Sequence, residues 1–325
     1  MMRAHAARLM LLGGLSLLHP FLAHAQADAM QWLQRASQAA KRLSYTGTFV
    51  YQSGSINETS RITHLVDAAG EAERLEVLDG SPREVVRIND EVQCFLSETR
   101  TVIVERRPGG HSFPALLPAS FGGGIGENYV VKKGAAGRVA GLETQAISIE
   151  PRDELRYGHQ WWVDTQSGLL VKASRIGERG EPLETFAFTE LRIGGPIDRE
   201  AIKPAARMKT QDWRVHQSVT TENKADDGAW NFRALPAGFR KISGMKRQAR
   251  ADAPPGMHWV FSDGLAAVSV FIDPLGETPA ETGFFKMGAL NVYKRLLGEH
   301  LIVVLGDVPP VTLRRLGDGI EGRRK

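Results

Sequence analysis

The chain has 325 residues, of which 42% are hydrophobic, 24% charged and 7% aromatic. This is the composition of an ordinary globular chain, so it excludes a disordered protein, a collagen-like chain and a polytopic membrane protein. A single cysteine, Cys94, excludes an intramolecular disulfide framework and a cysteine-based zinc site. The formal net charge of +4 includes two arginines near the N-terminus, Arg3 and Arg8.

The first 25 residues have the features of a secretory signal peptide. The two arginines form its basic part, residues 9–18 form its apolar part, and Ala23-His24-Ala25 is an A-x-A cleavage site. The apolar part is too short for a membrane anchor, because spanning a bilayer takes about 20 apolar residues. No cysteine lies near this site, which excludes lipid attachment there. We therefore expect cleavage after Ala25 and export of the mature protein.

After this segment, the hydrophobic pattern predicts one helix and then a series of strands. Apolar side chains recur at helical spacing in residues 28–43, whereas residues 45–51 alternate with a period of two. The turns between strands are too short for crossover helices, so neighbouring strands must be antiparallel. The sequence thus predicts one large meandering sheet, strongly curved or partly closed. Its further strands are expected at residues 61–66, 74–78, 84–88, 92–96, 101–105, 129–132, 138–150, 159–163, 169–176 and 183–193.

Residues 107–127 interrupt this strand pattern. Phe113, Leu117 and neighbouring apolar residues lie between prolines and a glycine run at 122–124. We interpret this segment as a short helix on a connection that lies over one mouth of the curved sheet. A plain loop with core residues and a ligand gate both fit the pattern.

Charge and composition divide the rest of the chain. Residues 26–205 carry a net charge of −3 and residues 229–325 a net charge of +5, with a polar segment, 206–228, between them. We expect a signal peptide at 1–25, a large domain at 26–205, a linker at 206–228, a smaller domain at 229–318 and a tail at 319–325.

In the smaller domain, the pattern predicts a hairpin with strands at 257–262 and 265–272 and a type I′ turn at Asp263-Gly264. A helical or turn region is expected at 282–297 and a strand at 301–305. Pro309-Pro310 is expected to start a final helix that ends at Leu316, with a frayed end from residue 317.

No motif for catalysis is found. The sequence contains no G-x-S-x-G elbow, no H-E-x-x-H, no C-x-x-C and no phosphate-binding G-x-x-x-x-G-K-[ST] loop. The six histidines after residue 25 are too far apart in sequence for a local metal clip. We therefore predict no enzyme activity, no metal and no cofactor.

Two features suggest binding, and the first is a stripe of aromatic and apolar side chains at alternating strand positions. On a closed sandwich such side chains would fill a core. On a curved, incompletely closed sheet they would line a cavity able to hold an acyl chain. The predicted ligand-binding residues are Phe49, Tyr51, Phe113, Leu117, Trp161, Phe186 and Phe188.

The second feature is a basic cluster at the start of the smaller domain. It is either a solvated face or a patch for an acidic polypeptide or lipid phosphates. Nucleic acid is not an expected partner of an exported protein. The predicted partner-binding residues are Arg240, Lys241, Lys246, Arg247 and Arg250.

Short segments in order across nearly the whole mature chain carry a further signal. They are Leu43-Ser44-Tyr45 with Thr48-Phe49, residues 73–85, Trp162-Val163-Asp164-Thr165 with Ser167-Gly168-Leu169-Leu170, Leu235-Pro236-Ala237-Gly238-Phe239, Ser262-Asp263-Gly264-Leu265 and Gly306-Asp307-Val308-Pro309-Pro310. This ordered set resembles the RseB/MucB family, periplasmic regulators of the sigma-E envelope-stress pathway, which in some species controls alginate.

The resemblance implies an α+β fold: a large half-open antiparallel barrel similar to LolA and LolB, with helices in its concavity, and a smaller antiparallel sheet packed with a helix. It implies a periplasmic protein that binds the periplasmic part of a membrane anti-sigma factor (RseA/MucA-like) and shields it from the site-1 protease. Lipid or lipopolysaccharide-type signals would release that partner. The resemblance implies no catalytic residues, and it is compatible with a homo-oligomer.

The competing hypothesis is a periplasmic lipoprotein or lipid carrier of the LolA/LolB type. Such a carrier would share the half-barrel but would need neither the second domain nor its positive charge. An exported hydrolase, the third class, lacks a nucleophile constellation.

Overall fold

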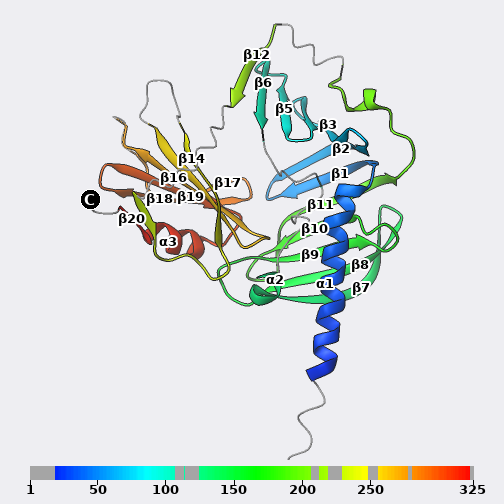
Figure 1. The fold of residues 1–325 in the computed structure, drawn as a ribbon, viewed down its shortest axis with the longest axis horizontal. Coiled ribbons are helices and arrows are strands. Elements are labelled where there is room, and N and C mark those ends of the chain that lie inside the picture. The colour runs from blue at the N-terminus through cyan, green and yellow to red at the C-terminus, as the bar shows by residue number, and fades with distance from the viewer. Residues whose placement is uncertain are drawn as a thin grey trace, which may run out of the picture.

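The computed structural model describes residues 19–106, 113, 124–205, 212–218, 229–247, 255–276 and 280–322. These residues form a large sheet of twelve strands, a separate sheet of six strands and a pair of short strands. Figure 1 shows the large sheet as a strongly curved layer crossed by the N-terminal helix, with the smaller sheet beside it. The predicted fold class, α+β with a large curved antiparallel sheet and a smaller sheet domain, is confirmed. No helix in the described part of the chain is long and apolar enough to cross a membrane.

The large sheet is a meander that turns back on itself. Neighbours in the chain pair antiparallel from β1 to β6 and from β7 to β11, and pairing between β1 and β11 joins the two runs. The strands are β1 (Tyr45–Ser53), β2 (Ile56–Asp67), β3 (Gly70–Val77), β4 (Arg83–Ile88), β5 (Glu91–Leu96), β6 (Thr101–Arg106), β7 (Tyr129–Val139), β8 (Leu142–Pro151), β9 (Gly158–Asp164), β10 (Leu170–Ile176) and β11 (Pro182–Ile193).

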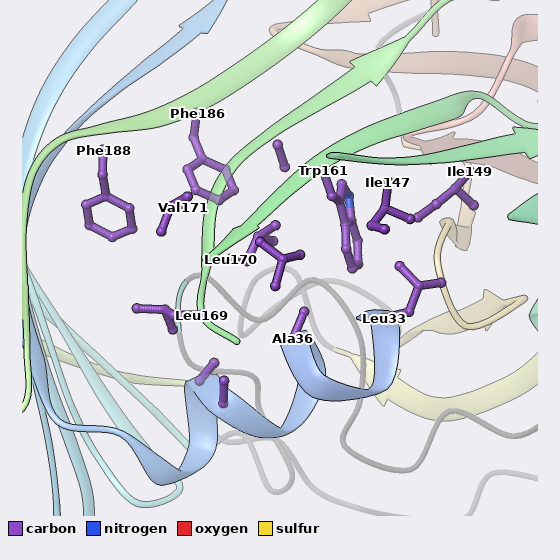
Figure 2. Packing of buried hydrophobic residues seen from close by; sticks show 14 of the residues in the cluster. Leu33, Ala36, Ile147, Ile149, Trp161, Leu169, Leu170, Val171, Phe186 and Phe188 are labelled. Atoms are coloured by element: carbon purple, nitrogen blue, oxygen red, sulfur yellow. The ribbon is translucent and has the colours of Figure 1, made fainter. Parts of the chain in front are cut away.

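The helix α1 (His19–Arg42) packs against β7, β8 and β10. It starts before the predicted residue 28, in a segment rich in alanine, a strong helix former. Leu33 and Ala36 point toward the strands, and Figure 2 shows them facing Trp161 and Ile147. The large hydrophobic core thus lies between the inner face of the curved sheet and α1. Two short helices complete this part of the chain: α2 (Gly124–Asn128), which overlaps the end of the region 107–127 expected to hold a short helix, and the 3₁₀ turn η1 (Arg199–Ile202).

A twelfth strand comes from residues 206–228, which the sequence predicts to be a linker. β12 (Arg214–Ser218) pairs parallel with β6, with Arg214 opposite Thr101. Trp213, just before it, packs on a small apolar cluster at the outer face of β2 to β6. The strand has no hydrophobic alternation, because its only apolar residue, Val215, is 59% exposed, so the strand pattern is missing from the sequence.

The smaller sheet has the order β14-β15-β16-β19-β18-β17. Its hydrophobic core lies between one sheet face and α3, around Trp259, Phe261 and Leu313. The elements are β13 (Trp230–Phe232), β14 (Arg240–Arg247), β15 (Gly256–Ser262), β16 (Ala267–Pro274), β17 (Gly283–Met287), β18 (Leu290–Leu297), β19 (His300–Gly306), α3 (Pro310–Asp318) and β20 (Ile320–Gly322), which pairs with β13.

The turn between β15 and β16 differs from the predicted type I′ turn at Asp263-Gly264. The connection spans four residues, and the second strand begins at Ala267 instead of Leu265. The cause is the Asp263 carboxylate, whose Oδ1 accepts the backbone N–H groups of Leu265 (2.9 Å) and Ala266 (2.8 Å). These donors are therefore lost to the strand ladder.

Three other predictions of local structure are wrong. Residues 282–297 form the hairpin of β17 and β18, because Gly288, with a φ of 59°, makes a tight turn in the middle of the helix-like spacing. Residues 138–150 are split by a turn at Ala140 and Gly141, whose φ angles are 50° and 80°. The chain end is ordered through residue 322, since Ile320 is buried in the core.

Candidate functional site

Four phenylalanines form an aromatic cluster on the inner face of the large sheet. Phe49 comes from β1, Phe186 and Phe188 come from β11, and Phe113 comes from the connection between β6 and α2. The Phe113 ring stacks on Phe49 with a centroid distance of 4.3 Å and meets Phe186 edge-on at 4.9 Å. Phe49, Phe186 and Phe188 are buried, and Figure 2 shows the two β11 rings pointing toward the interior. The structure therefore brings four of the predicted ligand-binding residues into direct contact.

The other predicted ligand-binding residues are placed differently. Trp161 on β9 is 1% exposed in the same core, and its indole N–H has no hydrogen-bond partner among the described residues. Tyr51 is half-buried at the edge of the core, where its hydroxyl donates to Glu184 Oε2 at 2.8 Å. Leu117 lies outside the described residues. This packing has the burial of a core, and the ligand role of these residues stays a prediction.

A buried polar network lies beside the aromatic cluster. Tyr45, His64, Glu73 and Arg87 occupy facing positions on the successive strands β1 to β4, so their side chains share one face of the sheet. Two of them bind the backbone of Phe113. The Tyr45 hydroxyl donates to the Phe113 carbonyl oxygen, and the Phe113 N–H donates to Glu73 Oε2 at 3.1 Å. The network thus fixes the residue that completes the aromatic cluster.

His64 links the buried network to the carboxylate of Glu71. Its two ring nitrogens face two acceptors, the Leu43 carbonyl oxygen at 2.9 Å and Glu71 Oε1 at 3.0 Å. A neutral imidazole has a single N–H, so both contacts form together only as an imidazolium or with a protonated Glu71. Burial raises the pKa of Glu71, but hydrogen bonds from His64 and Arg87 outweigh it and hold that pKa below its ordinary value. Burial raises the pKa of Glu73 to about 7 against the attraction of Arg87 and His64.

The substitution Glu73→Gln is expected to change the pH dependence of stability. A pKa of about 7 in the folded state, against an ordinary 4.5, means that the folded state binds this proton more tightly than the unfolded state. The Glu73 contribution to the free energy of unfolding therefore falls as the pH rises from about 4.5 to about 7. Relative to the wild type, the variant should gain up to about 3 kcal/mol across this window.

Urea unfolding of both proteins between pH 4.5 and 7.5 measures this gain. Other shifted groups are common to both proteins and cancel in the difference, among them the partly buried His159, whose pKa is lowered to about 3 by desolvation. A constant difference between the two stability curves would contradict the prediction.

A second buried site joins the two sheets around Arg156, which lies between β8 and β9. Its Nε donates to Asp153 Oδ1 at 2.9 Å and its Nη1 donates to Asp263 Oδ2 at 2.7 Å. Its Nη2 donates to the Ala237 carbonyl oxygen at 2.7 Å, and the Tyr129 hydroxyl donates to the same Asp263 oxygen at 2.9 Å. The side chains of Arg156 and Asp263 are both fully buried, so this ion pair between the two domains is shielded from water.

Arg175 on β10 makes a similar contact at the same interface. Its Nη2 donates to the Ala289 carbonyl oxygen at 2.9 Å, in the turn between β17 and β18. The same side chain lies 3.4 Å from Glu184 and 3.7 Å from Asp307. Burial raises the pKa of Asp307 to about 6, although a backbone N–H and Arg175 oppose the shift. The two domains are therefore joined through two buried arginines.

The sequence gives no direct indication of these contacts of Arg156 and Arg175 between the two domains. Asp263 and Asp307 lie in two of the segments that carry the family resemblance, which is the one signal available. Arg156 and Arg175 stand in no motif, and their partners are far away in the chain. Among the described residues, no group of three or more His, Cys, Asp or Glu side chains is arranged to hold a metal.

The predicted basic cluster lies on β14, an outer strand of the smaller sheet. Arg240, Lys241 and Lys246 are exposed, and no described carboxylate forms an ion pair with them. Ile242 is 63% exposed and lies where the register with β15 shifts. The Arg247 side chain and Arg250 lie outside the described part. Four of the five predicted partner-binding residues thus belong to one strand, and their role stays a prediction.

Together, these features define a two-domain α+β protein in which a large curved sheet, with aromatic side chains on its inner face, is joined through buried ion pairs to a smaller sheet. Sequence models of two domains match the chain: the MucB/RseB N-terminal domain at residues 28–206 and the MucB/RseB C-terminal domain at residues 224–321. The chain belongs to the MucB/RseB family.

Individual relatives agree with this assignment. The sigma factor AlgU regulatory protein MucB of Pseudomonas aeruginosa is 31% identical over 300 residues, covering 89% of this chain and 90% of the relative. The sigma-E factor regulatory protein RseB of Escherichia coli is 26% identical, covering 89% of each chain. The structure of MucB in a Pseudomonas aeruginosa MucA/MucB complex is similar with a TM-score of 0.72 and 28% identity, covering 92% of this chain and all of that chain. The structure of MucB alone gives a TM-score of 0.65 and covers 91% and 98% of the two chains.

Proposed function

We propose that the chain is a periplasmic negative regulator of a sigma-E-type envelope-stress response. It binds the periplasmic part of a membrane anti-sigma factor, shields that part from the site-1 protease and releases it in response to lipid or lipopolysaccharide-type signals. The chain acts by binding, with no catalytic step of its own.

The observation that carries this proposal is the match across both domains. MucB, a relative that a crystal structure shows together with MucA, superposes on 92% of this chain with both domains included. The leader-like residues 1–25 support a periplasmic location. The aromatic cluster supports a lipid-responsive large domain, because binding sites for acyl chains are lined mainly by apolar and aromatic side chains.

Release by a lipid follows from thermodynamic linkage. A lipid lowers the affinity for the partner only if it binds the free chain better than the complex. A coupling free energy of about 1–3 kcal/mol would change the partner's affinity about 5–150-fold. The aromatic cluster and the Phe113 contacts offer a place for such competition, because Phe113 occupies the centre of the cluster.

A reconstituted proteolysis assay tests the proposal. The mature chain, the periplasmic segment of the anti-sigma factor from the same organism and the site-1 protease are combined, and the rate of cleavage is measured with and without lipopolysaccharide. We expect tight binding, slower cleavage when the chain is present, and recovery of cleavage when lipopolysaccharide is added. Absence of binding, or cleavage at the same rate with and without the chain, would overturn the regulatory function.

The second candidate function is a lipid or lipoprotein carrier, which the buried aromatic cluster favours. The same preparation distinguishes it, since a carrier would take up lipidated client proteins and leave the anti-sigma segment unbound. The buried joint at Arg156 favours the regulator, because a carrier has no need of a smaller domain held in a fixed position.

Reversing the charge of β14 is expected to slow partner association. Exposed ion pairs contribute about 0–1 kcal/mol each, so one substitution would have little effect. The fourfold variant Arg240→Glu, Lys241→Glu, Lys246→Glu and Arg247→Glu should reduce the association rate and flatten its dependence on salt. Stopped-flow association at low and high salt measures both quantities.

The matched control reverses four exposed basic residues of the large domain: Lys132, Lys133, Arg138 and Arg179. It changes the net charge by the same amount. Equal slowing in the two variants would show that only net charge matters, and an unchanged rate in the β14 variant would identify its cluster as a solvated face.

A further inference from the structure

The two outer strands of the smaller sheet have opposite character. β14 carries several basic residues and a register shift, which are the features that protect the edge of a sheet from pairing with another chain. β17 lacks them: it has the sequence GFFKM, with one charge and no proline, and its register with β18 has no shift. No described strand pairs with the outer side of β17. This edge is therefore available to a further strand.

Large apolar side chains are exposed along this edge. Phe284 is 39% exposed and Met287 56% exposed on β17, and Leu296 on the neighbouring β18 is 48% exposed. Each value would be unremarkable for an isolated side chain. Phe284 projects to the sheet face that carries α3, whereas Met287 and Leu296 project to the opposite face, so an added strand would have exposed apolar neighbours on both faces.

The same edge carries positive charge without a compensating partner. The Arg314 guanidinium lies 4.7 Å from the centroid of the Phe284 ring, and the Lys294 amine lies 4.7 Å from that of Phe285. Lys286 is exposed on β17 itself. No described carboxylate forms an ion pair with these three cations. Acidic side chains on an incoming strand would complement them.

The register predicts which backbone groups of β17 face outward. Met287 and Leu290 flank the two-residue turn, so they form a hydrogen-bonded pair. Hydrogen-bonded and non-hydrogen-bonded pairs alternate along an antiparallel ladder. The pairs of Phe284 with Tyr293 and of Lys286 with Asn291 are therefore non-hydrogen-bonded, and the N–H groups of Phe284 and Lys286 point away from β18.

The strand is also held in place before any partner arrives. The turn that follows β17 accepts a hydrogen bond from the buried Arg175 of the large domain, at the Ala289 carbonyl oxygen. Phe284 is further stacked on Tyr293, with a centroid distance of 4.8 Å. A preordered edge loses little conformational entropy on binding, which favours affinity.

We propose that β17 binds an extended, acidic segment of a partner protein as an additional strand of the smaller sheet. This rests on the proposed function, in which the partner is the periplasmic part of an anti-sigma factor. Outward N–H and carbonyl groups of β17 supply affinity, and the three cations select acidic side chains. β14 steers association through its charge, whereas β17 forms the bound interface.

Three single substitutions test the assignment. Lys286→Pro removes an outward N–H and leaves the ladder with β18 intact, a position where an outer strand tolerates proline. Lys286→Ala removes the charge but keeps that N–H. Ile242→Pro makes the corresponding change on β14, at a residue with no register partner on β15. Binding of the purified periplasmic segment of the anti-sigma factor is measured by calorimetry, with thermal unfolding as the check on folding.

We expect Lys286→Pro to weaken binding about tenfold or more, which corresponds to the loss of a backbone hydrogen bond and its neighbours. Lys286→Ala should weaken it about twofold to fourfold, and Ile242→Pro should leave it unchanged. Hydrogen exchange of the wild type gives a readout that needs no variant, because the amides of Phe284 and Lys286 should become protected only when the partner is bound.

The remaining outcomes contradict the assignment in different ways. Unchanged affinity of Lys286→Pro with unchanged exchange at β17 overturns the strand addition and leaves the proposed function standing. Loss of binding in Ile242→Pro alone places the interface on β14. If the wild type is a dimer and Lys286→Pro converts it to a monomer, the strand that pairs with the outer edge of β17 comes from a second copy of the chain. Absence of binding by the wild type overturns the proposed function and the strand addition with it.

Discussion

Asp263→Ala is expected to lower the free energy of unfolding by about 3–5 kcal/mol, because it leaves a buried arginine without its charge partner. The Arg156 guanidinium lies 2.7 Å from Asp263 Oδ2, and both side chains are fully buried. The same carboxylate also accepts the Tyr129 hydroxyl and the N–H groups of Leu265 and Ala266. One substitution therefore removes the partners of several buried donors.

Chemical unfolding of the Asp263→Ala variant measures this loss. The matched control is Glu143→Ala, which removes an ion pair with Arg138 whose side chains are 67% and 70% exposed, and which should cost less than about 1 kcal/mol. The double variant Arg156→Met, Asp263→Ala should be destabilised by less than the sum of the two single changes, because no buried charge is left unpaired at Asp263. If Asp263→Ala lowers the free energy of unfolding by less than about 1 kcal/mol, water must reach Arg156 at the domain interface.

Phe186→Asp is expected to destabilise the large domain by more than about 3 kcal/mol. Phe186 is 7% exposed, and its ring lies 4.9 Å from that of Phe113 and 6.4 Å from those of Phe49 and Phe188, between centroids. A carboxylate there loses these contacts and finds no cation within the aromatic cluster. Thermal and urea unfolding of the variant measure the effect.

Phe186→Leu is the companion variant that separates a core role from a ligand role. It keeps most of the side-chain volume, so the stability should fall only modestly, by about 1–2 kcal/mol. Binding of a fluorescent fatty-acyl probe is then compared between this variant and the wild type. Weaker binding in a folded variant supports the predicted ligand site, whereas equal binding makes the aromatic cluster a core alone. Wild-type stability of Phe186→Asp would contradict the packing itself.

The sheet architecture could be predicted from the sequence because it depends on local patterns. Strands with a period of two and connections such as residues 165–168 leave no room for crossover helices, and antiparallel order follows. Pro309-Pro310 indicates the start of α3 for an equally local reason, the fixed φ of proline. These signals need no knowledge of distant parts of the chain.

Other parts of the structure depend on contacts that a local pattern does not contain. Leu290, Tyr293 and Leu297 have helical spacing, yet the turn at Gly288 and pairing with β19 make this segment a strand. Arg156 is buried only because a turn of the other domain brings Asp263 to it. The aromatic residues could be selected from their alternation, but their closure around Phe113 depends on the polar network at Glu73.

The parallel strand β12 has a consequence for the order in which the chain folds. Its partner β6 is complete long before the ribosome reaches Arg214, and domains generally fold from the N-terminus as they are synthesised. The large sheet can therefore form most of its ladder early but gains its last strand only when the segment leading to the smaller domain is present. Pairing across such a long stretch of chain is slow. The segment that leads into the smaller domain is thus attached to the large sheet when most of that sheet has already formed. The smaller sheet therefore begins to fold next to a folded domain.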